Sequence, residues 1–122
     1  MRTVLITGAS SGIGESCARV FAREGMRLIL AARRRDRLEA LAAELAQQFG
    51  TESHLLQLDV RDRAQVETAL SHLPKPWDAV DVLINNAGLS RGLEPFQEAS
   101  IDDWEEMIDT NIKGLLYVTR TL

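Results

Sequence analysis

Short apolar runs alternate with amphipathic stretches along the whole chain. Four apolar runs have the length of a strand, and the second is almost continuously apolar, as expected when both faces are covered: 3–7, 27–32, 53–58 and 81–85. Apolar residues recur at helical spacing in four other stretches: 12–23, 36–49, 62–73 and from Ser100–Ile101 onward. Strands that alternate with helices predict an α/β fold with a doubly wound parallel sheet and right-handed crossovers.

The expected strand order is third, second, first, fourth, as in the amino-terminal half of a Rossmann-type fold. The fourth strand would then leave Val82, Leu83 and Ile84 as an open apolar edge, which is a liability in a finished protein. The last helical pattern also continues to Leu122 without a glycine or polar residue to close it. We therefore expect one domain, residues 1–122, that ends within its last helix and lacks a carboxyl-terminal half.

A glycine-rich segment, Thr7-Gly8-Ala9-Ser10-Ser11-Gly12-Ile13-Gly14, joins the first expected strand to the first expected helix. Backbone N–H groups in such a turn converge on one point, where the dipole of the helix favours an anion. Gly8 permits the tight exit from the strand, Gly12 lets the backbone approach a pyrophosphate, and Gly14 allows the helix to pack closely on the sheet. No histidine lies at a spacing that would make a serine nucleophilic, so the hydroxyls are expected to bind phosphate. The segment predicts a dinucleotide-binding domain with these candidate contacts: Gly8, Ser10, Ser11, Gly12, Ile13 and Gly14.

Two arginines, Arg33 and Arg34, directly follow the second expected strand. In a dinucleotide-binding fold this position meets the adenosine ribose, where an acidic residue bonds the 2′-OH of NAD and an arginine accommodates the 2′-phosphate of NADP. Ala32 stands where the acidic residue would be, and guanidinium groups pair well with phosphate. The alternative is a solvated helix start that also includes Arg35 and Arg37, although helix starts favour acidic side chains. We therefore expect NADP as the cofactor.

Polar residues follow the third and fourth expected strands as well. Asp59, next to Val60, could accept a hydrogen bond from an adenine amino group or could cap the helix that begins near Asp62, and the sequence leaves both roles open. Asn85-Asn86-Ala87-Gly88 falls at the carboxyl edge of the sheet, where such folds bind ligands, although Asn and Gly are also typical turn residues. The two amides could tie strand ends together and line a cofactor cleft.

Asn111 and Gly114 interrupt an otherwise regular helical pattern with two weak helix formers. They indicate a local distortion of the helix or a packing requirement, and the alternative for Asn111 is an ordinary surface position. Four other conspicuous side chains are expected to pack or to stand alone rather than to form a metal site: Cys17, His54, His72 and Trp77.

Composition narrows the class of partner. The net charge of −4, with both signs interspersed, argues against nucleic acid or an anionic membrane as the main partner. No apolar run is long enough to span a bilayer, and the first residues lack the apolar segment of a signal peptide. A single cysteine cannot form an internal disulfide, so we expect a cytoplasmic protein.

Taken together, the motifs resemble those of the short-chain dehydrogenase/reductase family. The glycine loop matches the TGxxxGxG pattern of that family, and three segments match its later signatures in order and spacing: Asp59-Val60, Asn85-Asn86-Ala87-Gly88 and Asn111-Ile112-Lys113-Gly114. Within the family, Arg33-Arg34, Leu73-Pro74 and residues 85–120 are similar to the NADP-dependent 3-hydroxy acid (serine) dehydrogenases. The resemblance implies hydride transfer between NADP(H) and an alcohol/ketone pair such as a 3-hydroxy acid, with Asp59, Val60, Asn86, Ala87 and Gly88 among the cofactor contacts.

The resemblance also implies a catalytic group made of an Asn, a Ser and a Tyr-x-x-x-Lys. Asn111 would be the asparagine, which holds a water in a proton relay to the lysine, while the tyrosine acts as general acid and base. The only tyrosine, Tyr117, is followed four residues later by Thr121, so we expect this chain alone to be inactive. The family further implies a homo-oligomer, often a tetramer formed through the last helix.

Two other interpretations remain open from the sequence. One is a non-catalytic nucleotide-binding or interaction module of the same fold. The other is a flavodoxin-like or signalling α/β domain, against which the arginines after the second strand and the paired asparagines after the fourth both argue.

Overall fold

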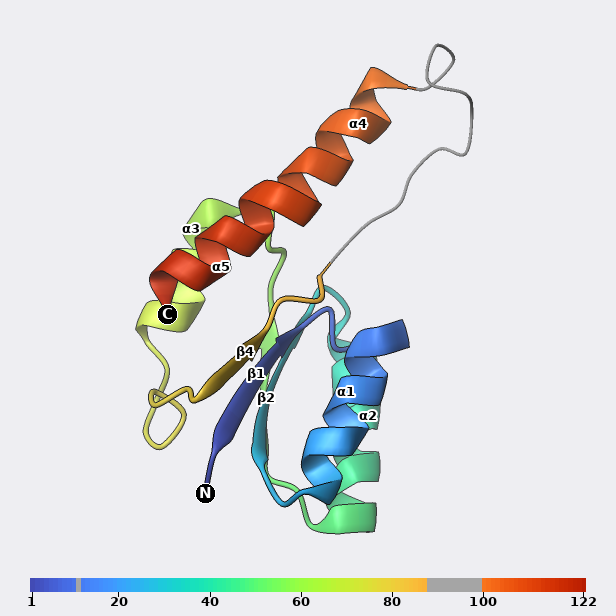
Figure 1. Cartoon of the computed structure of the whole chain (residues 1–122), viewed down its shortest axis with the longest axis vertical. Coiled ribbons are helices and arrows are strands. Elements are labelled where there is room, and N and C mark those ends of the chain that lie inside the picture. Colours follow the sequence, from blue (N-terminus) through green and yellow to red (C-terminus); the bar gives the residue numbers. More distant parts are fainter. Residues whose placement is uncertain (11, 88–99) are drawn as a thin grey trace.

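A parallel four-stranded sheet forms the centre of the molecule, with helices on both faces (Figure 1). The computed structural model describes residues 1–10, 12–87 and 100–122, with only the backbone of Trp104. The elements follow one another as β1 (Thr3–Thr7), α1 (Gly12–Arg23), β2 (Arg27–Ala32), α2 (Arg35–Phe49), β3 (Ser53–Gln57), α3 (Arg63–Ser71), β4 (Val82–Ile84), α4 (Ile101–Ile108), the π-helical segment η2 (Asp109–Gly114) and α5 (Leu115–Thr121). The strand order is β3-β2-β1-β4, which confirms the predicted Rossmann-type α/β fold.

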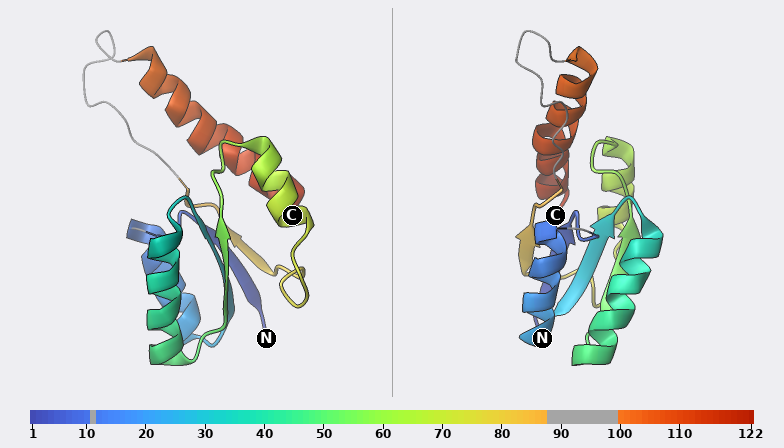
Figure 2. Two further views of the ribbon diagram at one scale, coloured as in Figure 1. Left: turned by 180° about the vertical axis from the view of Figure 1, so that it is seen from behind. Right: turned by 90° about the vertical axis from the view of Figure 1, so that its right-hand side faces the viewer.

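Each face of the sheet has its own hydrophobic core. Helices α1 and α2 cover one face, where Ala18, Leu38 and Leu45 pack on alternate residues of β1 and β2. Helices α3 and α5 cover the other face, where Val66 and Val118 pack on the residues between them. The two further views show the sheet between these two pairs of helices (Figure 2). The central strands β1 and β2 are buried on both faces, which explains why their sequences are almost continuously apolar.

Helices α4 and α5 lie along one line with η2 between them, and α4 extends beyond the sheet (Figure 1). The Ser100 hydroxyl accepts a hydrogen bond from the Asp103 N–H at 3.4 Å and so caps α4. The predicted distortion at Asn111 and Gly114 is confirmed, because both residues lie in η2, where the backbone is wound as a π-helix.

Three predicted elements are shorter in the structure than in the sequence pattern. Helix α3 begins after Asp62, whose carboxylate accepts from the Gln65 N–H and therefore stands at the N-cap position. Strand β4 begins after Asp81, whose carboxylate accepts the Thr3 N–H, and it ends before Asn85. Strand β3 ends at Gln57, although the Leu58 N–H still bonds the Ala32 carbonyl at 3.0 Å.

The described strands leave β4 at an edge, because it pairs with β1 alone among them. Across the described ranges, no helix is both long enough and apolar enough to cross a membrane.

Candidate functional site

A cavity of about 320 Å³ opens where the carboxyl ends of all four strands meet. The end of β2 and the loops after the four strands supply most of its wall, with one residue from α2 and one from η2. The lining residues are Gly8, Ser10, Ala31, Ala32, Arg33, Arg34, Arg37, Leu58, Asp59, Val60, Arg61, Asn86, Ala87 and Thr110. This edge of an open parallel sheet is where ligands bind in doubly wound folds. The cavity therefore brings together candidates that are up to 79 residues apart in the sequence, from Gly8 to Ala87.

The glycine loop has the backbone geometry that its sequence predicts. Gly8 adopts φ +62° at the exit from β1, and a Cβ atom there would lie 2.9 Å from the Ala87 Cα atom. At Gly14 a Cβ atom would collide with the Gly8 carbonyl oxygen, so α1 sits as close to the loop as the prediction required. The tight turn and the close approach of α1 are thus both confirmed.

Thr7 and Asn86 join the loop after β1 to the loop after β4. The buried Thr7 hydroxyl accepts hydrogen bonds from the Asn86 and Ala87 N–H groups, both at 3.0 Å. The Asn86 side-chain amide donates to the Gly8 carbonyl at 3.2 Å, and that of Asn85 donates to Thr119 Oγ1 at 2.9 Å. The predicted tie between strand ends is confirmed for the Asn86 amide, whereas the Asn85 amide joins the end of β4 to α5. The sequence does not predict this role for Thr7, although a threonine at the buried end of a strand can indicate a hydroxyl that bonds a neighbouring loop.

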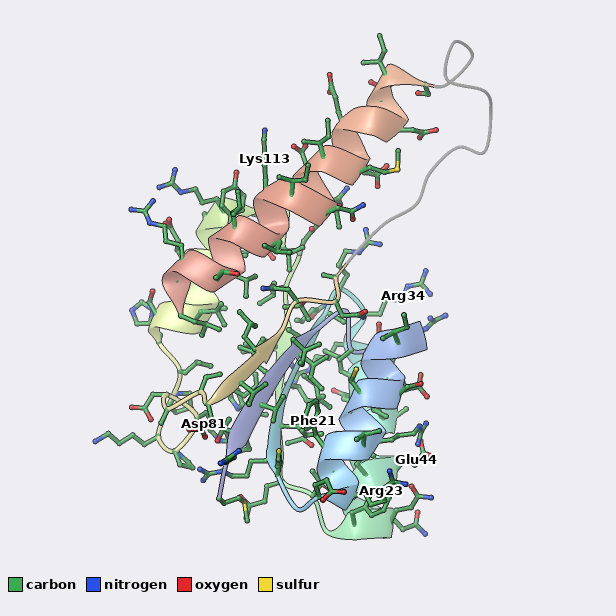
Figure 3. The ribbon with its side chains drawn as sticks, in the orientation of Figure 1. Phe21, Arg23, Arg34, Glu44, Asp81 and Lys113 are labelled. Atoms are coloured by element: carbon green, nitrogen blue, oxygen red, sulfur yellow. The ribbon has the colours of Figure 1, made fainter. Side chains whose placement is uncertain are left out.

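Arg33 and Arg34 line the cavity where the end of β2 meets the start of α2. Figure 3 labels the side chain of Arg34. Arg34 occupies the N-cap position of α2 without a side-chain capping bond. Neighbouring Arg35 instead turns to Glu39, whose carboxylate lies 3.1 Å away. Arg37, one turn into the helix, lines the same cavity as the first two. Arg33 and Arg34 are exposed at the start of α2 and also border the cavity, so the assignment of the 2′-phosphate to them stays a prediction.

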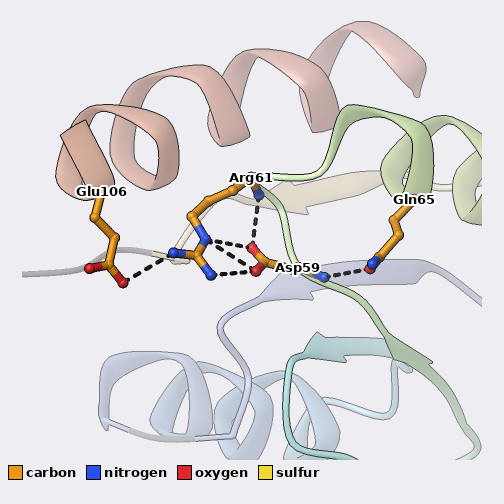
Figure 4. A network of polar contacts seen from close by, with 4 residues as sticks. All are labelled: Asp59, Arg61, Gln65 and Glu106. Atoms are coloured by element: carbon orange, nitrogen blue, oxygen red, sulfur yellow. Dashed lines mark hydrogen bonds and ion pairs between the residues drawn. The ribbon is translucent and has the colours of Figure 1, made fainter. Parts of the chain in front are cut away.

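Asp59 faces the cavity with its carboxylate held by Arg61 (Figure 4). The guanidinium donates to both carboxylate oxygens, and the closest contact is Nη2 to Oδ2 at 2.6 Å. These hydrogen bonds hold the pKa of the Asp59 carboxyl below its ordinary value, against the opposing effect of partial burial. The alternative role of Asp59 as the cap of α3 is wrong, because Asp62 caps that helix.

Four of the remaining predicted residues do not line the cavity. Gly12 and Ile13 are exposed at the start of α1, and Gly14 is buried behind the loop. Asn111 is exposed on η2, next to the lining residue Thr110. Ser11 and Gly88 fall outside the described residues, so their predicted contacts stay predictions.

Charge on the cavity wall suits a polyanion. Four lining residues are arginines and one is an aspartate, so positive charge exceeds negative charge. Across the described residues, His, Cys, Asp and Glu side chains form no group of three or more that could hold a metal ion. Cys17 packs at the edge of the core beneath α1 and α2 as predicted, and Trp77 stacks on His54 with ring centroids 5.5 Å apart. The excess of positive charge on the cavity wall therefore favours an anionic ligand.

Comparison with known proteins decides the family. The family model for short chain dehydrogenases matches residues 2–122. The chain belongs to the short-chain dehydrogenase family. Its relatives include the NADP-dependent 3-hydroxy acid dehydrogenase YdfG of Salmonella typhi, 51% identical over 119 residues that cover 98% of this chain and 46% of that protein.

Solved structures of short-chain dehydrogenases agree with this family assignment. The serine dehydrogenase of Escherichia coli superposes with a TM-score of 0.90 at 49% identity, over 98% of this chain and 53% of that one. A closed form of serine dehydrogenase complexed with NADP⁺ gives a TM-score of 0.88 at 48% identity, over 98% of this chain and 47% of that one. The chain therefore spans about half the length of the dehydrogenases it matches.

Proposed function

We propose that the cavity is the NADP(H) site of an oxidoreductase that interconverts an alcohol and a ketone, such as a 3-hydroxy acid and its keto acid. The observation that carries the proposal is the set of arginines at the cavity end of β2, where an NAD-specific protein would place an acidic residue. The similarity to NADP-dependent 3-hydroxy acid dehydrogenases supports the same cofactor and substrate class.

The proposed contacts are grouped by the part of the dinucleotide that they would bind. Gly8, Ser10 and the start of α1, with Ser11, Gly12, Ile13 and Gly14, would hold the pyrophosphate through backbone N–H groups and hydroxyls. Arg33 and Arg34 would bind the 2′-phosphate through charge-assisted hydrogen bonds. Asp59 and Val60 would receive the adenine, and Asn86, Ala87 and Gly88 would border the nicotinamide half. In this arrangement the residues would hold an extended dinucleotide.

The bound nicotinamide supplies the hydride acceptor or donor for the reaction. During oxidation of the alcohol, its hydroxyl proton would pass to a base. Asn111 would hold a water in the relay that carries this proton, as the family resemblance implies. No tyrosine in these 122 residues is followed by a lysine four positions later, so we propose that turnover needs residues beyond this domain.

The proposed setting is a cytoplasmic homo-oligomer, which in this family is often a tetramer. Large apolar side chains are exposed along η2 and α5, including Ile112 at 56% and Leu116 at 57%. Exposed apolar residues that gather on one helix suit an interface between subunits. A non-catalytic nucleotide-binding module of the same fold is the second candidate, because this stretch carries the cofactor motifs without the Tyr-x-x-x-Lys pair.

Cofactor titration and turnover separate the two candidates. NADPH binding is measured by fluorescence, and reduction of small 3-keto acids by absorbance, for the 122-residue chain and for the protein expressed from its complete gene. We expect the product of the complete gene to bind NADPH and turn over, and the 122-residue chain to show no turnover. Binding without turnover by the complete product favours the non-catalytic module, and failure of that product to bind NADPH contradicts the proposed site.

A further inference from the structure

Arg61 makes the densest set of polar contacts in the cavity wall (Figure 4). Its Nε atom lies 3.0 Å from Asp59 Oδ1 and 3.1 Å from Oδ2, its Nη2 atom lies 2.6 Å from Oδ2, and its own backbone N–H donates to Oδ1 at 3.0 Å. This forked, charge-assisted arrangement fixes both the position and the plane of the carboxylate. Asp59 therefore presents one orientation to the cavity instead of several rotamers.

A third nitrogen of the same guanidinium reaches a different element. Arg61 Nη1 lies 3.0 Å from Glu106 Oε1 on α4, 45 residues further along the chain. The side chains of Arg61, Asp59 and Glu106 are 31%, 26% and 25% exposed, whereas those of the ion pair Arg63–Glu67 on α3 are 63% and 52% exposed. Partly buried charges are screened less by solvent and salt, so the Arg61 network holds its geometry more firmly than a surface pair.

The backbone of Asp59 is held as well. Its N–H donates to Gln65 Oε1 at 3.0 Å, and Gln65 stands in the first turn of α3. The carboxylate, the main chain and the neighbouring arginine are thus anchored to α3 and α4 together.

We infer that Arg61 is a positioning residue that fixes the Asp59 carboxylate at the adenine end of the cavity and ties that end to α4. The inference rests on the proposed function, in which Asp59 receives the adenine. A side chain ordered before binding loses no further rotamer freedom when the ligand arrives. The guanidinium also offsets the negative charge of Asp59, which would otherwise oppose the phosphates of the cofactor. Because α4 continues into η2, the same contact links the adenine end to the segment that carries Asn111.

The first test uses Arg61→Met, which keeps the aliphatic stem but removes the fork. Binding of 2′,5′-ADP, an adenosine fragment of NADP, is measured by calorimetry with the protein expressed from its complete gene. We expect the dissociation constant to rise about tenfold, because Asp59 becomes mobile and its charge is no longer offset. The matched control is Arg63→Met, which breaks an ion pair of similar length (2.9 Å) outside the cavity and should leave the affinity unchanged.

The second test uses Glu106→Gln, which cuts the link to α4 and leaves the fork on Asp59 in place. In the unmodified protein, 2′,5′-ADP should slow amide hydrogen exchange in residues 101–114. Glu106→Gln should abolish that ligand-dependent protection and keep the affinity within about threefold. A residue with only a structural role would not produce a ligand-dependent difference of this kind.

Three outcomes overturn the inference. Equal affinities for Arg61→Met and Arg63→Met contradict the role of Arg61 in fixing Asp59. If 2′,5′-ADP still slows amide exchange in residues 101–114 of Glu106→Gln, the link to α4 is contradicted. If Arg61→Met does not fold, this exchange measurement alone tests the inference. Failure of the unmodified protein to bind 2′,5′-ADP contradicts both the proposed function and the inference. Binding whose affinity does not change on substitution of Arg61 contradicts the inference alone.

Discussion

At the scale of single residues, the arginines of this chain separate into those with a carboxylate partner and those without one. Arg19, Arg35 and Arg63 each pair with a glutamate, and the two hydrogen-bonded glutamates beside Arg19 raise its pKa further. Arg33 and Arg34 have no ion-pair partner within the ranges that the structure describes, yet they border the same cavity. Unpaired positive charge beside a cavity favours an anionic ligand there.

Replacing Arg33 and Arg34 together with alanine should weaken NADPH binding by about a hundredfold or more and leave NADH binding nearly unchanged. Each guanidinium that bonds a phosphate contributes about 1.5–3 kcal/mol, and NADH has no 2′-phosphate. The measurement is the dissociation constant of both cofactors by fluorescence titration.

Arg35→Ala is the matched control for that double substitution. This residue is the next in sequence, but it pairs with Glu39 and does not line the cavity, so both cofactors should keep their affinity. Equal losses of NADPH and NADH affinity in the double variant would show that Arg33 and Arg34 do not recognise the 2′-phosphate.

At the scale of elements, the π-helical segment η2 packs closely against the loop after β3 at Gly114. A Cβ atom at Gly114 would lie 2.6 Å from Val60 Cγ2 and 3.0 Å from the Val60 carbonyl oxygen. The helix can pass this close to the loop after β3 only with a glycine at the contact. The close approach places Thr110 at the cavity and Asn111 beside it.

Gly114→Ala should destabilise the protein by about 1–3 kcal/mol, the usual cost of forcing extra atoms into a packed contact. Alanine is a better helix former by at most about 1 kcal/mol, so the collision outweighs the gain in propensity. The free energy of unfolding is measured by urea denaturation.

Val60→Ala in the same background removes Cγ2, and the double variant should be more stable than the sum of the single effects predicts. A stabilising Gly114→Ala, or strictly additive effects, would contradict this packing explanation.

The helices and strands could be predicted well because the apolar periodicity of each segment reflects which of its faces is buried. The bounds of β1, α1 and β2 follow from apolar periodicity and from glycines that end or begin turns, and they coincide with the prediction. Asn111 and Gly114 also predicted a distortion, but not that it would be a π-helix. Val60, which Gly114 contacts, lies 54 residues earlier and is brought there by the sheet.

At the scale of the whole molecule, the site depends on contacts that no local pattern encodes. The strand order brings the Thr7 hydroxyl next to the N–H groups of Asn86 and Ala87. The sequence predicted a connection between strand ends but not these partners. The bridge from Arg61 to Glu106 was not predictable, because nothing in either local sequence specifies its partner 45 residues away. The sequence thus located most cavity residues, whereas the side chains that position them became visible only in the folded structure.

The most direct test of the central claim is a crystal structure of the protein, expressed from its complete gene, with NADP⁺ bound. We predict the 2′-phosphate within hydrogen-bonding distance of Arg33 or Arg34, the pyrophosphate over the loop from Gly8 to Gly14, and the adenine against Asp59. A dinucleotide bound elsewhere, or one in this cavity with its 2′-phosphate pointing into solvent away from both arginines, would contradict the claim.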